Sequence, residues 1–101
     1  MGIEIELRRQ NTVVRRSYEH GETLALALDT LVPPGQGRLS QIDPYRDTRF
    51  TESDAQAALP EVTALLRECT SPFQEAALRD LAEMLEACAA TPGGCLWFIG
   101  D

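Results

Sequence analysis

Hydrophobic and polar residues alternate strictly at the start of the chain. In residues 2–9, GIEIELRR, three aliphatic side chains share one face of an extended chain, and glutamates and an arginine share the other. Strict alternation is typical of a strand with one buried face. Gln10-Asn11 predicts a two-residue turn, and residues 12–19, TVVRRSYE, predict a strand that returns beside the first. The chain therefore opens with a β-hairpin.

The register of this hairpin has two interpretations. A two-residue loop pairs Leu7 with Val14 and Glu6 with Arg15. The second pair is a salt bridge that contributes about 0.2–1 kcal/mol. The same register places Arg16 on the apolar face of the first strand. Either Arg16 lies at the edge of the sheet, or the loop is one residue longer and the register flips.

Residues 22–32, ETLALALDTLV, fit both the period of a helix and that of a strand. We predict a helix, because alanine is a poor strand former and Glu22 suits a first helical turn. The loop PPGQG, residues 33–37, ends it. Strands are then predicted at 38–43, RLSQID, and at 48–50, TRF, and the turn DPYRD joins them.

A capping box is predicted next, because Thr51 is followed by Asp54 at the required spacing. Pro60 is expected to divide the segment that follows. Residues 52–58 would form a short turn or helix, and a stronger helix would begin at the proline, which suits a first helical position.

The last helix is expected to begin after Ser71. Ser71 is placed to cap it, Pro72 occupies the first helical position, and Gln74 completes a capping box. Gly93-Gly94 ends the helix. Its expected apolar stripe consists of Phe73, Ala77, Leu78, Leu81, Met84, Leu85 and Cys88.

Five consecutive apolar residues, Cys95 to Ile99, form the final predicted strand. Because they do not alternate, we expect both faces of this strand to be covered and the strand to lie in the interior of the sheet. Burial of Trp97, Phe98 and Ile99 contributes about 1.5–3 kcal/mol apiece. Truncation after Gly94 is therefore expected to unfold the protein. If one face is open to water instead, a homodimer becomes the leading interpretation.

The predicted order of elements is β-β-α-β-β-α-α-β. We therefore predict an α+β fold with a mostly antiparallel sheet, helices packed on one face and the C-terminal strand inside. A chain of 101 residues forms a single domain, residues 1–101.

The net charge of −7 is confined to the second half of the chain. Residues 51–101 contain nine acidic residues and only Arg67 and Arg79 as bases. This balance argues against nucleic acid and anionic membranes as partners and permits a basic protein partner. All nine basic residues are arginine, which is typical of a GC-rich genome. With no expected signal peptide and no membrane-spanning run, a cytoplasmic location is predicted.

Residues for nucleophilic or metal chemistry are sparse. The single histidine, His20, follows the second predicted strand and is interpreted as an exposed turn residue. Cys69, Cys88 and Cys95 form no CxxC pair and are interpreted as small buried apolar residues. Cys88 and Cys95 flank a turn and could approach each other. No catalytic residue, metal or cofactor is predicted.

The most distinctive polar segment is the turn IDPYRDTRF, residues 42–50. Asp43 and Asp47 suit an acid–base pair or a hard cation, and they equally suit ordinary turn hydrogen bonds. An enzyme would use these two with Tyr45 and Asp101. A possible binding surface consists of Asp43, Tyr45, Arg46, Asp47 and Arg49.

Together, IDPYRDTRF and the final CLWFIGD resemble a family of small uncharacterised bacterial proteins of this length. Members of that family have a DPYxDT hairpin before the helices and end with an aromatic strand and Gly-Asp. The resemblance implies the fold and implies no activity.

Three functions are consistent with the sequence. The favoured one is a non-enzymatic binding or regulatory module, similar to immunity proteins, whose acidic helical face binds a basic protein. The second is a small enzyme or ligand-binding protein that uses the Asp43–Asp47 turn. The third is a homodimer that pairs through an exposed face or edge of its sheet.

Overall fold

One antiparallel sheet and three helices make up the computed structural model, which describes residues 2–100. The strands β1 (Ile3–Arg9), β2 (Thr12–Ser17), β3 (Thr48–Phe50) and β4 (Gly94–Gly100) lie in the order β2-β1-β4-β3. Every neighbouring pair is antiparallel. The predicted α+β class is confirmed, and β4 lies in the interior of the sheet, as predicted.

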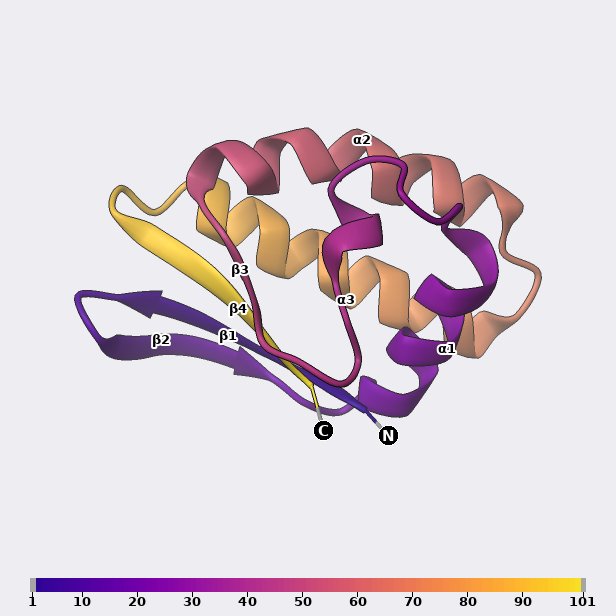
Figure 1. Ribbon diagram of the computed structural model, residues 1–101, viewed down its shortest axis with the longest axis horizontal. Coiled ribbons are helices and arrows are strands. Elements are labelled where there is room, and N and C mark those ends of the chain that lie inside the picture. The colour runs from indigo at the N-terminus through magenta and orange to yellow at the C-terminus, as the bar shows by residue number, and fades with distance from the viewer. Residues whose placement is uncertain (1, 101) are drawn as a thin grey trace.

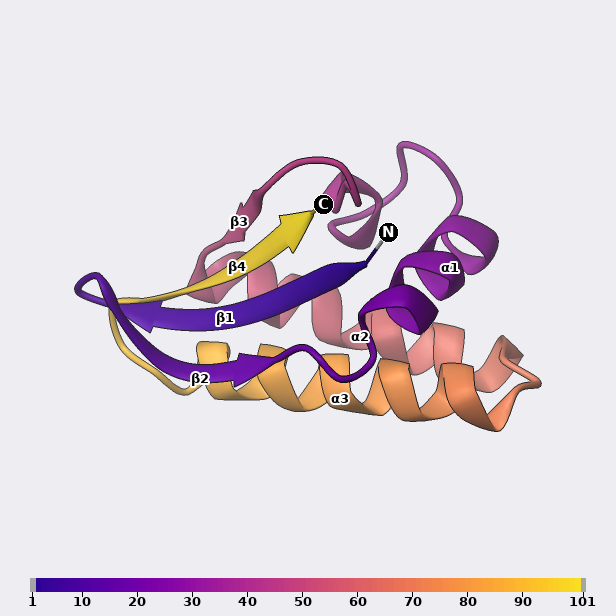
Figure 2. The ribbon, with the colours of Figure 1, turned by 90° about the horizontal axis from the view of Figure 1, so that it is seen from below.

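The helices are α1 (Gly21–Leu31), α2 (Glu52–Glu68) and α3 (Pro72–Ala89). Figures 1 and 2 show α2 and α3 side by side under one face of the sheet, with α1 near the end where the chain begins. The opposite face carries no helix in either view (Figures 1 and 2). The prediction of a helix over the ambiguous residues 22–32 is confirmed by α1.

The core lies between the sheet and this helical layer. The inward-facing side chains of β1 and β4 are almost fully buried, and they meet the apolar stripes of the helices. The rings of Phe50 and Phe98 pack edge to face with their centroids 4.9 Å apart. Within residues 2–100, no buried side-chain nitrogen or oxygen lacks a hydrogen-bond partner.

The predicted strand at 38–43 is wrong. This segment forms the short 3-10 helix η1 (Leu39–Gln41) and a loop. Leu39 and Ile42 are buried three residues apart, which is the spacing of a turn rather than of a strand. The backbone N–H groups of Arg38 and Leu39 each donate to the Glu61 carboxylate at 3.0 Å. A side chain of α2 therefore satisfies amides that a sheet would otherwise have paired.

The division of the second helix at Pro60 is also wrong. α2 begins after Thr51 with the predicted Thr51–Asp54 capping box and continues through Pro60 to Glu68. An internal proline costs about 3 kcal/mol because it removes a hydrogen bond and crowds the preceding turn. Here Pro60 faces solvent, while buried residues on both sides of it pack into the core: Ala55, Ala58, Val62 and Leu65. Packing outweighs the local penalty.

α3 begins at Pro72 as predicted, with the Ser71 hydroxyl accepting the N–H groups of Phe73 and Gln74 at 3.2 and 3.4 Å. The predicted capping box is wrong in its second half, because the Gln74 side chain does not bond back to Ser71. The predicted apolar stripe is buried from Ala77 to Cys88. Phe73 is an exception, because its side chain is 76% exposed. It lies in the first turn, ahead of the part of α3 that packs against the core.

The hairpin resolves the register problem with a bulge. Gln10 and Asn11 both have positive φ, 52° and 65°, as a two-residue turn of this kind requires. The pairing register of β1 and β2 shifts between Leu7 and Arg8, so that Glu6 lies opposite Arg16. The expected pairs Leu7–Val14 and Glu6–Arg15 are therefore wrong. The extra residue moves Arg16 to the charged face of β1 without lengthening the loop.

Candidate binding surface on the open face of the sheet

β4 has one covered and one uncovered face. Leu96 and Phe98 are fully buried against the helices, whereas Cys95, Trp97 and Ile99 are only half-buried on the opposite face. The expectation that both faces are covered is therefore wrong. Neighbouring strands share their faces, and β1 has glutamates and an arginine on the same side as Trp97.

This uncovered surface is called the open face below. Its residues follow from the register of the four strands, which places them on the side away from the helices. They are Glu4, Glu6 and Arg8 of β1, Val13 and Arg16 of β2, Arg49 of β3, and Cys95, Trp97 and Ile99 of β4.

A single row crosses the open face from edge to edge. Arg16 lies opposite Glu6, Glu6 lies opposite Trp97, and Trp97 lies opposite Arg49. Directly opposed side chains on antiparallel strands are in contact range. The row therefore places an aromatic ring between a charged pair and an exposed arginine.

Arg8 covers part of the Trp97 ring. Its guanidinium carbon lies 4.9 Å from the ring centroid, which is within the range of a cation–π contact. The same guanidinium donates to Glu6 Oε1 from Nε at 2.9 Å and from Nη2 at 2.7 Å. Arg8 is thus held over the indole by a carboxylate of its own strand.

Glu6 holds a second arginine through its other oxygen. Arg16 Nη2 lies 3.0 Å from Glu6 Oε2, and Arg16 Nε lies 3.4 Å from Glu4 Oε1. The Glu6 side chain is only 8% exposed beneath these guanidinium groups. The hydrogen bond from Arg8, and secondarily the nearby Arg16, hold the pKa of Glu6 below its ordinary value of 4.5 despite the opposing effect of burial. Glu6 is therefore an anionic anchor for two arginines.

The predicted binding surface at residues 43–49 is split by the structure. Arg49 belongs to the open face, opposite Trp97. Asp43 forms turn hydrogen bonds instead: its Oδ1 accepts the Tyr45 N–H at 2.8 Å, and its carbonyl accepts the Arg46 N–H at 3.2 Å. Asp47 is exposed. These contacts match the turn interpretation. Asp101 lies outside the described residues.

The turn packs against the end of the final strand. A Cβ at Gly100 would lie 2.6 Å from the carbonyl oxygen of Pro44 and 2.7 Å from the nitrogen of Arg46. Only glycine allows so close a backbone approach. The two segments that the sequence singled out, DPYRD and CLWFIG, are therefore neighbours. The turn packs against the C-terminal end of β4.

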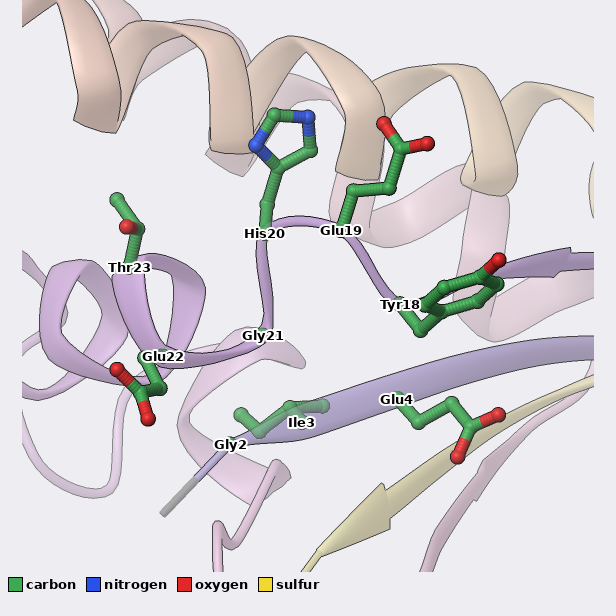
Figure 3. Close-up of a pocket in the computed structure, with 9 residues that line it drawn as sticks. All are labelled: Gly2, Ile3, Glu4, Tyr18, Glu19, His20, Gly21, Glu22 and Thr23. Atoms are coloured by element: carbon green, nitrogen blue, oxygen red, sulfur yellow. The ribbon is translucent and has the colours of Figure 1, made fainter.

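His20 lines a shallow hollow of about 400 Å³ between the start of β1 and the start of α1 (Figure 3). Three glutamates, Glu4, Glu19 and Glu22, also line it. Figure 3 shows their carboxylates pointing in three different directions rather than toward a common point. Among residues 2–100, no group of three or more His, Cys, Asp or Glu side chains is placed to hold a metal ion.

The three cysteines are free thiols. Cys88 is buried in the core, and burial is the main cause that raises its pKa to about 11. A thiol with so high a pKa is a poor nucleophile. Cys69 and Cys95 are half-buried, and Cys95 lies on the open face beside Arg8.

Several acidic residues of the helical layer make hydrogen bonds or ion pairs within the fold. Glu61 accepts two loop amides, and Glu52 accepts the Gly93 N–H at 2.7 Å. Asp54 caps α2 and pairs with Arg38 at 2.8 Å. Two further acids bind the hairpin: Glu83 pairs with Arg15 at 3.4 Å, and Asp80 accepts the Ser17 hydroxyl. Much of the acidic excess is thus engaged in internal contacts.

No helix within residues 2–100 has the length and apolar character needed to span a membrane. Comparison of the chain with known protein families, with curated proteins and with solved structures finds no match. The function of the open face is therefore inferred from its own residues. The sequence signal for it was the strict alternation of residues 2–9, because a strand with one charged face requires its neighbours to expose that face too.

Proposed function

We propose that this protein is a non-enzymatic binding module that docks a partner protein on its open face. The observation that carries this proposal is Trp97, the single tryptophan, half-buried on the uncovered side of an interior strand beneath Arg8. Tryptophan and arginine are the residues most enriched at the centres of protein interfaces.

The arginines on this face are held in place before any partner arrives. Glu6 fixes Arg8 over the indole and fixes Arg16 at the next strand. Side chains that are already ordered lose less conformational entropy on binding. The open face therefore combines an apolar centre with charged groups in defined positions.

The edges of the sheet suit docking less well than the face. β2 is an edge strand, and it contains a bulge and the charged pair Arg15-Arg16. β3, at the other edge, extends only from Thr48 to Phe50. Short strands, bulges and charges are the devices by which proteins discourage pairing along an edge.

The alternative functions have weaker support. A basic partner on the acidic helices would compete with contacts that Glu61, Glu52 and Asp54 already make. In an enzyme at the Asp43–Asp47 turn, one oxygen of the Asp43 carboxylate would already be engaged, because it accepts the Tyr45 amide. An uncovered face of β4 also favours a homodimer, but a second copy of the open face offers little to Arg49, because Glu6 and Glu4 already pair with arginines. The experiments below detect self-association as a separate outcome.

Capture from a lysate of the source cell tests the proposal when it is compared across variants. We expect one polypeptide to be retained by the wild-type protein and lost with Trp97→Ala and with Arg49→Ala. The matched control is Leu26→Ala, because Leu26 is 60% exposed on α1 and is not part of the open face. The proposal is wrong if a polypeptide retained by the wild type is retained equally by both open-face variants.

A further inference from the structure

We infer that the open face recognises a carboxylate-bearing segment of its partner, with an apolar side chain between two acidic ones. This inference rests on the function proposed above and adds the chemistry of the partner. The charges of the face carry it: Arg8, Arg16 and Arg49 outnumber Glu4 and Glu6, although the whole chain has a net charge of −7.

Of the two carboxylates of the face, Glu6 has little left to offer a basic partner. Both oxygens of Glu6 already hold guanidinium groups, and its side chain is 8% exposed. Glu4 pairs with Arg16 through Oε1 at 3.4 Å, and its side chain is 41% exposed. Among the residues from 2 to 100, Arg49 forms no ion pair, and it is exposed beside Trp97. The unsatisfied group on this face is thus a cation.

The spacing of the arginines defines the segment. Arg16 and Arg49 lie on the two edge strands of the row, and Trp97 lies between them. Three steps between strands correspond to about 14 Å. In an extended peptide the first, third and fifth side chains point the same way and span about 13 Å. In a segment that crosses the strands with acidic residues first and fifth, these two residues meet Arg16 and Arg49. Trp97 lies about 10 Å from Arg16 along the row and the third side chain lies about 7 Å along it, so an apolar residue at that position reaches the indole from the Glu6 side.

Arginine also suits this task because its planar guanidinium binds a carboxylate through two parallel hydrogen bonds. Arg49 is available to form such a pair. Arg16 can share its guanidinium, because its side chain is 49% exposed even when paired with Glu4 and Glu6. The apolar residue of the segment would pack on the part of the indole that Arg8 leaves uncovered.

Titration of the full chain with three synthetic peptides tests this inference. The first is acetyl-Gly-Glu-Ser-Leu-Ser-Glu-Gly-amide, and in the other two both glutamates become glutamine or lysine. Two-dimensional NMR follows the Trp97 indole N–H and the Arg49 backbone amide. We expect the glutamate peptide to shift both signals, to lose affinity with added salt, and to bind at least about tenfold more tightly than the glutamine peptide.

A charge reversal sharpens the test. Arg49→Glu should weaken the glutamate peptide and improve the lysine peptide, whereas the matched control Arg67→Glu, an exposed arginine on α2, should change neither. Tighter binding of the lysine peptide to the wild-type face, or no shift of the Trp97 signal with the glutamate peptide, overturns the inference.

Two further results separate this inference from the proposed function. If capture of a partner depends on Trp97 while the glutamate peptide does not bind, the docking function stands and the acidic chemistry is wrong. If sedimentation shows a dimer that Arg49→Glu dissociates, the occupant of the open face is a second copy of the chain, which also overturns the inference.

Discussion

The two faces of one sheet differ in what covers them and in what their side chains do. On the covered face, Leu96 and Phe98 are fully buried, and the helices supply their neighbours. On the open face, Trp97 is half-buried, and its cover is Arg8, which is held by Glu6. The same strand thus supplies stability on one side and a recognition surface on the other.

The largest effect should come from removing β4, which carries both faces. Truncation after Gly94 deletes the strand between β1 and β3 and exposes their inner edges. We expect the shortened chain to lose cooperative thermal unfolding, as measured by circular dichroism. A shortened chain that still melts cooperatively would show that the core closes without β4.

Adjacent residues of β4 allow the two faces to be compared directly. Phe98→Ala should lower the free energy of unfolding by about 3–5 kcal/mol, because it leaves a cavity in the core. Trp97→Ala should cost less than Phe98→Ala, because Trp97 keeps part of its surface exposed and its removal leaves a smaller cavity. Urea denaturation measures both values. Equal losses would mean that the two faces are covered alike.

Gly100 tests how the end of β4 is fixed. Gly100→Ala would bring a methyl group within 2.6 Å of the Pro44 carbonyl and force the turn away from the strand. We expect a loss of about 1–3 kcal/mol in the free energy of unfolding. Gly35→Ala provides a comparison in which added atoms meet nothing within 4 Å, although its φ of 75° brings its own backbone strain.

The charged network of the open face predicts a dependence on pH. The pKa of Glu6 is lowered in the folded protein, so its contribution to stability is fully present above pH 4.5 and is lost as the pH falls through the folded pKa below that value. Glu6→Gln should remove this part of the acid dependence in denaturation curves recorded at several pH values. An unchanged acid dependence would mean that Glu6 is not held as a carboxylate by its arginines.

Local sequence patterns correctly predicted the elements that have a regular hydrophobic period or a clear helix cap. The alternation of residues 2–9, the capping box at Thr51 and the proline start of α3 are all confirmed. The pattern gave wrong predictions where residues distant in the sequence determine the local structure. Glu61 of α2 turns residues 38–41 away from the sheet, and core packing carries α2 through Pro60.

The candidate site was predicted in part. Arg49 was named within the turn segment, but Trp97 was assigned to the core because its neighbours are all apolar. Its true environment depends on the pairing of β4 with β1, where it lies opposite Glu6. Composition within one strand does not reveal that pairing. The bulge that brings Arg16 onto the same face is likewise a property of two strands together.

Collisional quenching of tryptophan fluorescence tests the central claim most directly, because Trp97 is the single tryptophan of the chain. The net charge of −7 alone would favour the cation caesium over the anion iodide as a quencher. An open face with arginines around Trp97 predicts the reverse: ready quenching by neutral acrylamide and stronger quenching by iodide than by caesium. A tryptophan that resists acrylamide, or that caesium quenches better than iodide, would contradict the account.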